Sequence, residues 1–108
     1  VVYRLGNLFV LPSAYGETWG LAVNEAMACG RPVLVSDRVG CAPDAVDATC
    51  GRVFSWADPH SLGAALNDMT GDRHVLVQMG RAAGDRAWSF DVARTEEALV
   101  TAVQRVCR

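Results

Sequence analysis

The sequence contains no lysine and no isoleucine, although it is 108 residues long. Its ten lysine-or-arginine positions are therefore all arginine, and twelve aspartates and glutamates outnumber them, so the net charge at neutral pH is −2. This balance excludes the strongly basic surface that is typical of nucleic-acid-binding domains. Because the codons of both missing residues are rich in A and T, the composition favours a GC-rich bacterial genome.

Long apolar runs and paired cysteines are absent as well. No uninterrupted apolar run reaches the roughly 18 residues that a membrane-spanning helix needs, and no basic segment followed by an apolar one predicts a signal peptide. The cysteines form no Cys-x-x-Cys pair and stand at no spacing typical of a zinc site. We therefore expect reduced thiols and a cytoplasmic protein. The four cysteines are Cys29, Cys41, Cys50 and Cys107.

The length corresponds to about one small domain. Hydrophobic residues make up 51% of the chain and charged residues 20%, which is ordinary for a soluble globular domain. Because Val1 stands in what reads as the middle of a domain, we expect the chain to be a piece of a longer protein.

The first third of the chain predicts a strand, a glycine-containing loop, a helix and a second strand. Residues 7–12 and 32–36 are short apolar runs typical of buried parallel strands. Residues 21–29 between them are rich in helix formers, and Gly30 fits a left-handed helix end. This order is a βαβ unit, whose crossover is right-handed in nearly all proteins.

The rest of the chain predicts one minor strand and mostly helices. We expect a short helical turn near Val46, a strand within residues 49–56, two helices at 61–69 and 73–88, and a last helix that ends near Cys107. The fold class is therefore α/β: the C-terminal half of a Rossmann-like, doubly wound parallel sheet domain that ends in several helices. Such a sheet would have two or three strands in this chain.

The best candidate for a ligand site is the loop at residues 13–20. In open α/β sheets, ligands bind beyond the carboxyl ends of the strands, and this loop also leads into a helix N-terminus, which favours a phosphate. Gly20 lacks the Cβ that would obstruct a close approach of the backbone. The carboxylates of Glu17 and Glu25 flank the loop and can accept hydrogen bonds from sugar or ribose hydroxyls. Glu25 lies roughly 7 Å along the helix axis from Gly20.

The segment that carries this pattern reads LPSAYGETWGLAVNEAMACGRPV, from Leu11 to Val33. It closely resembles the signature of retaining GT-B glycosyltransferases of the large family 4, or group 1, with its E-x7-E motif formed here by Glu17 and Glu25. The resemblance covers the whole chain in outline and is dense from Phe9 to Ser36. It implies that residues 1–108 are the C-terminal part of a nucleotide-sugar-binding domain, and that the N-terminal acceptor domain and the upstream strands are absent.

The resemblance also implies a role for each residue of the motif. Glu17 would be the catalytic residue and would contact the transferred sugar, and Glu25 would bind the ribose hydroxyls of the nucleotide. The resemblance implies no metal, because family members stabilise the leaving diphosphate with basic side chains. It implies no cofactor either, and the nucleoside diphosphate sugar is the donor substrate. The donor sugar and its diphosphate would be contacted by Glu17, Thr18, Trp19, Gly20 and Leu21.

The activity implied is transfer of a sugar, with retention, from the nucleotide sugar to a hydroxyl acceptor. Peripheral membrane association would go through the missing N-terminal domain, and the apolar face of the last helix would be exposed without that domain. Family members stabilise the leaving diphosphate with an arginine and a lysine from upstream, whereas this chain has no lysine, so we expect the isolated chain to be nearly inactive.

Two other interpretations stay open at this point. The first is another GT-B enzyme of nucleotide sugars, such as an epimerase, which the intact E-x7-E signature argues against. The second is a truncated, non-catalytic module that binds a nucleotide or a protein partner, which the missing basic residues favour for this isolated chain.

Overall fold

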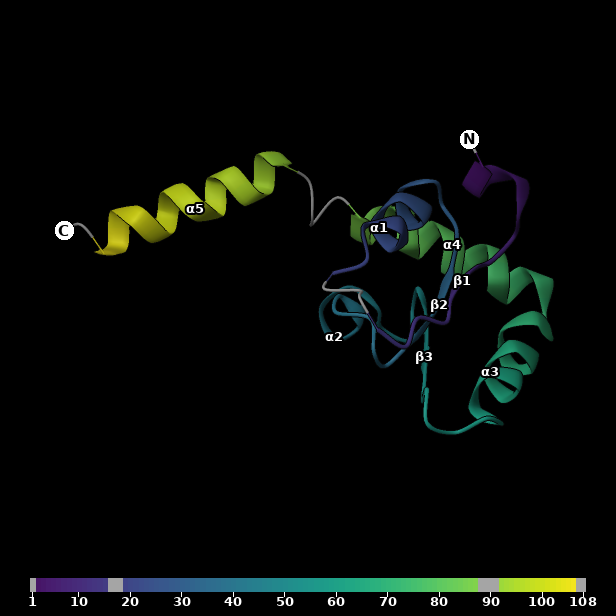
Figure 1. Ribbon diagram of the computed structural model, residues 1–108. Coiled ribbons are helices and arrows are strands. Elements are labelled where there is room, and N and C mark those ends of the chain that lie inside the picture. The colour runs from purple at the N-terminus through teal and green to yellow at the C-terminus, as the bar shows by residue number, and fades with distance from the viewer. Residues whose placement is uncertain (1, 16–18, 88–91, 107–108) are drawn as a thin grey trace.

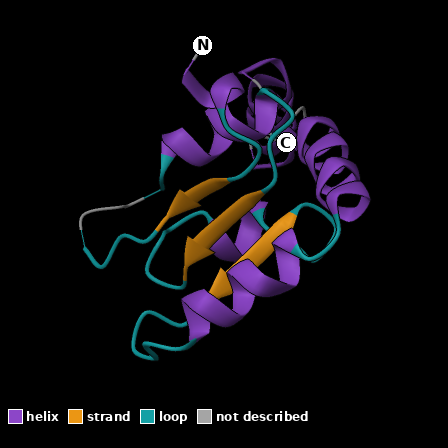
Figure 2. Ribbon diagram, turned by 90° about the vertical axis from the view of Figure 1, so that its right-hand side faces the viewer, coloured by secondary structure: helices purple, strands orange, loops and turns teal. Residues whose placement is uncertain are grey.

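The computed structural model describes residues 2–15, 19–87 and 92–106. Its centre is a parallel sheet whose strands follow one another in the order β1-β2-β3. Strand β1 spans Phe9–Leu11, β2 spans Val33–Ser36 and β3 spans Gly51–Phe54. Figure 2 shows the three strands side by side with helices above and below them. The α/β class and the parallel sheet predicted from the sequence are confirmed.

The helices follow the predicted order, with one addition. A short 3-10 helix at the N-terminus, η1, was not predicted. Helix α2 begins upstream of the predicted turn, because Pro43 suits the first turn of a helix. The helices are η1 (Val2–Leu5), α1 (Leu21–Ala28), α2 (Ala42–Ala45), α3 (Ser61–Thr70), α4 (Arg73–Ala87) and α5 (Val92–Val106).

Two hydrophobic clusters cover the two faces of the sheet. Val33 and Val35 of β2 pack with residues of α1, which covers one face. Leu34 points the other way and packs with Met69 of α3 and Met79 of α4. Every residue of β2 is buried, as expected for the central strand of a parallel sheet that is covered on both faces.

Helix α4 crosses the end of α1 at two glycines. A Cβ on Gly80 would collide with the backbone oxygen of Gly30. Gly30 itself has φ +72° at the end of α1, which confirms the predicted left-handed residue there. Gly80 costs α4 about 1 kcal/mol of helix propensity relative to alanine, and the close crossing explains why the position nevertheless holds glycine.

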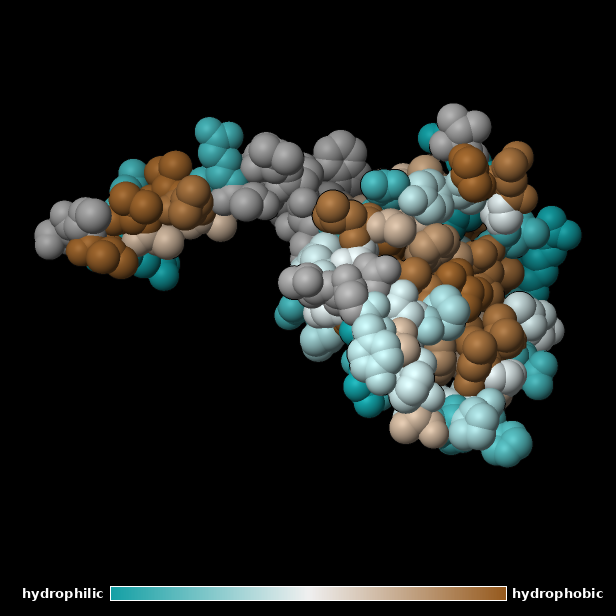
Figure 3. Space-filling model, viewed as in Figure 1, coloured by the Kyte–Doolittle hydropathy of each residue, from teal (hydrophilic) through white to brown (hydrophobic). Residues whose placement is uncertain are grey.

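Helix α5 extends away from the sheet and the other helices (Figure 1). The large apolar side chains in its described part are exposed, and Figure 3 shows hydrophobic atoms on this separate arm of the molecule. Among the described residues, no helix is both long and apolar enough to cross a membrane. The exposed apolar residues of α5 are Leu99, Val100, Val103 and Val106.

Candidate functional site

The predicted site lies at the carboxyl edge of the sheet, where β1 leads through its loop into α1. Glu17 and Thr18 fall outside the described residues. The described part of the predicted site consists of Trp19, Gly20 and Leu21 at the start of α1 and of Glu25 one turn later. The structure therefore shows where Glu25 and the N-terminus of α1 lie, and the position of Glu17 stays a prediction.

Gly20 determines the backbone conformation at the start of α1. It caps α1 with φ 95° and ψ 64°, in the left-handed region that glycine adopts most easily. A Cβ there would lie 2.9 Å from Cγ1 of Val39, closer than such atoms approach one another. Because Gly20 has no side chain, no side-chain cap covers the N-terminus of α1, and the N–H groups of its first turn remain suited to an anion.

Trp19 is held in place by contacts on both sides. Its indole Nε1–H donates a hydrogen bond to Oδ1 of Asn24 at 3.0 Å, and its backbone oxygen accepts one from the N–H of Cys41 at 2.8 Å. The ring is partly buried against the cluster on the α1 side of the sheet. These contacts give the Trp19 side chain a packing role and leave its backbone at the edge where the donor is expected.

Ser36 connects the two loops at this edge, a role that its sequence context did not indicate. It is a fully buried polar residue at the end of β2. Its hydroxyl donates a hydrogen bond to the backbone oxygen of Ser13, in the loop after β1, and accepts one from the N–H of Arg38 at 3.3 Å. The loop that leads to the predicted site is therefore tied to the neighbouring strand.

Glu25 is exposed on α1 and has a partner far away in the sequence. The hydroxyl of Tyr3 in η1 donates a hydrogen bond to its Oε2 at 2.8 Å. This bond to a carboxylate raises the pKa of Tyr3. The remaining lone pairs of Glu25 are free to accept further donors, because an ionised carboxylate accepts about four hydrogen bonds.

Arg31 holds η1 in place through hydrogen bonds to its backbone, and this positions Tyr3 close to Glu25. Its Nε donates to the backbone oxygen of Tyr3 at 3.2 Å and its Nη2 donates to that of Arg4 at 3.1 Å. The sequence did not predict the contact between Tyr3 and Glu25, because this contact depends on how η1 packs against α1. Tyr3 is thus a residue of the site that sequence reasoning missed.

A group of aromatic and cationic side chains lies at the same edge of the sheet. The rings of Tyr15 and Trp56 are 6.1 Å apart, and the guanidinium of Arg38 lies 5.3 Å from the centre of the Trp56 ring. These residues follow β1, β3 and β2 respectively. The contacts join the three loops at the carboxyl edge.

Two of the three described cysteines pack in the hydrophobic core, and Cys29 is half-buried. Cys41 and Cys50 are buried, and neither forms a disulfide with another described residue. Burial is the main cause that raises the pKa of Cys50, which keeps its thiol protonated. Within residues 2–15, 19–87 and 92–106, no three histidine, cysteine, aspartate or glutamate side chains are grouped so that they could hold a metal ion.

Comparison with known proteins identifies a family over most of the chain. The family model described as "Glycosyl transferases group 1" matches residues 1–86. The D-inositol 3-phosphate glycosyltransferase of Nocardia farcinica is 36% identical over 99 residues, which are 92% of this chain and 22% of that protein. The enzyme of the same name from Corynebacterium jeikeium is 37% identical over 99 residues, or 91% of this chain and 23% of that protein.

The fold is also similar to that of a solved structure. Sucrose-phosphate synthase from Thermosynechococcus elongatus superposes with a TM-score of 0.77 at 23% identity, over 99% of this chain and 27% of that one. At this identity the similarity shows the fold, which is that of a Rossmann-like GT-B fragment. The chain spans less than a quarter of the length of the curated relatives it matches.

Proposed function

Since the chain belongs to the group 1 glycosyltransferase family, we propose that it forms the C-terminal part of the nucleotide-sugar-binding domain of a retaining glycosyltransferase. In that role residues 1–108 hold the donor, a nucleoside diphosphate sugar. The complete enzyme then transfers the sugar to a hydroxyl acceptor, and the acceptor domain and upstream strands belong to other parts of it.

The observation that carries this proposal is the N-terminus of α1. It opens at the carboxyl edge of the sheet without a side-chain cap, and this is where doubly wound folds place a nucleotide diphosphate. The backbone N–H groups of Trp19, Gly20 and Leu21 are assigned to the donor sugar and diphosphate. Their positive partial charges, added to the helix dipole, stabilise an anion.

The two glutamates take the hydroxyl groups of the donor. Glu25 lies on the exposed surface of α1, one turn from its start, and is assigned to the ribose. Its Oε2 is oriented by Tyr3, which leaves Oε1 for the ribose hydroxyls. Glu17 is assigned to the transferred sugar as the catalytic residue, and Thr18 to the donor beside it. No metal or cofactor takes part in this assignment.

The isolated chain is proposed to bind the donor without completing the reaction. It has no lysine, so the pair of basic residues expected at the leaving diphosphate is not complete within it. Stabilisation of developing charge usually contributes the largest share of catalysis. The exposed apolar face of α5 is assigned to contact with the acceptor domain of the whole enzyme.

The test is nucleotide binding by the 108-residue chain, measured by calorimetry with uridine, guanosine and adenosine diphosphates. At least one of them is expected to bind, and Glu25→Gln is expected to weaken that binding at least about tenfold, because a charge-assisted hydrogen bond is worth roughly 1.5–3 kcal/mol. Glu96→Gln on α5 is the matched control, since Glu96 is also exposed and lies outside the site. Glu96→Gln is expected to bind like the native chain.

Other outcomes distinguish the alternatives. If none of the diphosphates binds, or if Glu25→Gln binds as tightly as the native chain, this assignment of the donor site is wrong. If binding depends on Glu25 but the full-length protein converts the donor sugar without transferring it to any hydroxyl acceptor, the epimerase alternative replaces the transferase. Binding with neither reaction in the full-length protein would favour a non-catalytic module.

A further inference from the structure

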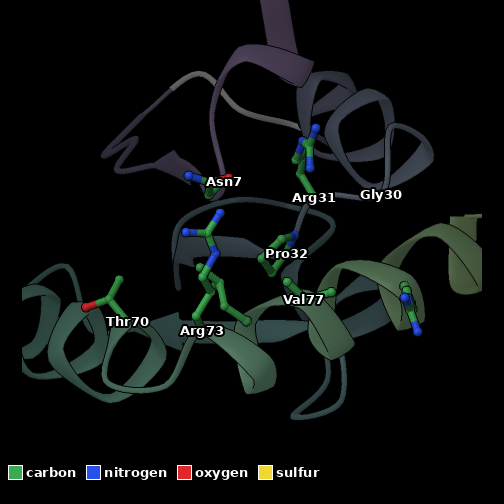
Figure 4. Close-up of a pocket in the computed structure, with 9 residues that line it drawn as sticks. Asn7, Gly30, Arg31, Pro32, Thr70, Arg73 and Val77 are labelled. Atoms are coloured by element: carbon green, nitrogen blue, oxygen red, sulfur yellow. The ribbon is translucent and has the colours of Figure 1, made fainter.

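A cavity of about 390 Å³ lies at the opposite edge of the sheet from the donor loop. Asn7, just before β1, and Pro32, just before β2, line it on one side, and residues of α4 line it on the other. Figure 4 shows Asn7 and Arg31 above the cavity and Arg73 and Val77 below it. Because both strands start here and end at the edge of the sheet that holds the donor loop, the length of the strands separates the two places.

The charges around this cavity have one sign. Three of the nine residues that line it are arginines, Arg31, Arg73 and Arg81, and none is acidic. This concentration is unusual in a chain whose net charge is −2. Asp72, the acid next to Arg73, accepts a hydrogen bond from the N–H of His74 at 2.8 Å and does not line the cavity. An anion is therefore the ligand that the charges favour.

The three arginines differ in how far their guanidinium groups are already engaged. Arg31 is held by two backbone oxygens of η1 through Nε and Nη2, and its Nη1 has no partner among the described residues. Arg73 points across the cavity toward Asn7 (Figure 4). In the described part of the chain, neither Arg73 nor Arg81 pairs with a carboxylate.

Part of the remaining lining is apolar. Pro32 is buried, and Leu76 and Val77 of α4 lie beside the arginines, while the uncharged polar residues Asn7 and Thr70 also line the cavity. Its volume falls within the range of about 300–1,000 Å³ that is typical of sites for small molecules, and exceeds what a lone inorganic anion fills. A ligand that matches these walls carries an anionic group at one end and a compact organic part at the other.

We propose that this cavity is a second binding site, which takes a small organic phosphate through Arg31, Arg73 and Arg81. The guanidinium fork of Arg73 matches the oxygens of a phosphate, and Nη1 of Arg31 is left to donate to the same anion from the other side of the cavity. This site is separate from the donor site and does not depend on the function proposed above. Its occupant would rest against the end of α1, the helix that carries Glu25.

The experiment is an NMR titration of the ¹⁵N-labelled 108-residue chain with glycerol 3-phosphate and, separately, with inorganic phosphate. We expect shifts of the backbone signals of Asn7, Arg31 and Val77, and tighter binding of the ester than of inorganic phosphate. Arg73→Gln/Arg81→Gln is expected to weaken binding at least about tenfold. The control Arg105→Gln removes an exposed arginine of α5 and is expected to change the affinity less than about twofold.

A second variant keeps the test decisive if the double variant does not fold. Val77→Glu places a carboxylate at an exposed position in the cavity wall and is expected to abolish phosphate binding. The proposal is wrong if neither phosphate shifts these signals, if only signals near Gly20 move, or if the arginine variants bind like the native chain. Glu25→Gln is expected to leave this binding intact, so failure of the donor site and failure of this site are distinguishable.

Discussion

At the scale of single residues, position 20 has two structural requirements that only glycine satisfies. Its φ of 95° lies in the left-handed region, and a Cβ would lie 2.9 Å from Cγ1 of Val39. The sequence predicted a glycine that lets the backbone approach a ligand. The structure adds that the same glycine allows the loops after β1 and β2 to pack against each other.

Gly20→Ala is expected to destabilise the chain. Strain at a positive φ and crowding of Val39 together predict a loss of about 1–3 kcal/mol in the free energy of unfolding, measured by urea denaturation. Gly63→Ala on α3 is the matched control, because nothing lies within 4 Å of a Cβ at Gly63 and alanine favours a helix. Equal stability of the two variants would contradict this account of Gly20.

Tyr3 is expected to act on the donor through Glu25. Tyr3→Phe removes the hydroxyl that donates to Oε2 of Glu25 at 2.8 Å, and should weaken nucleoside diphosphate binding about two- to tenfold, the worth of one hydrogen bond. In Glu25→Gln the same change should have little further effect, because the two residues act as a unit. Calorimetry on the four variants of this cycle measures the coupling, and additive effects would show that Tyr3 does not act through Glu25.

Asp47 is expected to make the stability depend on pH. Hydrogen bonds from Thr49, and then the charge of Arg86 at 3.1 Å, lower the pKa of Asp47 below its ordinary value of 3.8. Because its pKa is lowered in the folded state, ionised Asp47 stabilises the fold above about pH 4. This stabilisation is lost as the pH falls through the pKa of the folded state. Urea denaturation at pH 7 and pH 3 should therefore show a smaller loss of stability on acidification in Asp47→Asn than in the native chain.

The control for Asp47 is Asp85→Asn on α4, which removes an exposed carboxylate without a described partner. It should lose stability on acidification as the native chain does. If Asp47→Asn shows the same dependence on pH as the native chain, the bonds to Thr49 and Arg86 do not favour the ionised carboxylate in solution.

At the scale of secondary structure elements, the glycine in α4 and the apolar residues of α5 have different explanations. Glycine in α4 is needed where the helix crosses the end of α1, at Gly30. Helix α5, by contrast, is amphipathic but its apolar residues are exposed. The pattern of α5 predicted its helix correctly, since helical periodicity is local, but the pattern could not show what that face contacts.

Helix α5 is expected to add little to the stability of this chain. Leu99→Ser/Val103→Ser changes two side chains that are 64% and 52% exposed, so the free energy of unfolding should change by less than about 0.5 kcal/mol per site. Leu34→Ala, at a fully buried position, should cost about 2–5 kcal/mol in the same urea denaturation. A loss above 2 kcal/mol in the α5 variant would show that α5 packs on the sheet.

At the scale of the whole molecule, the sheet places its two candidate sites at opposite ends of the strands. The donor loop follows β1, and the arginine-lined cavity lies where β1 and β2 begin. Helix α1 runs from one edge to the other, since it starts at the donor loop and ends beside Gly30. Ligands at the two edges would therefore contact opposite ends of one helix.

The sequence by itself determined the order of the elements and the family. Apolar runs at residues 7–12 and 32–36 predicted the strands, and the segment from Leu11 to Val33 indicated the group 1 glycosyltransferases, because strand and helix periodicity and a contiguous motif are local properties. The roles of Glu17 and Glu25 remain predictions of that resemblance.

The tertiary structure alone decided the contacts between segments that are far apart in the chain. The bond from Tyr3 to Glu25 joins residues 22 positions apart, and the cavity gathers Asn7, Arg31 and Arg73 from three separate segments of the chain. Such contacts depend on how η1 and α4 pack around the sheet. Nothing in the local sequence encodes them, because packing is set by the shapes of surfaces that only the folded chain brings together.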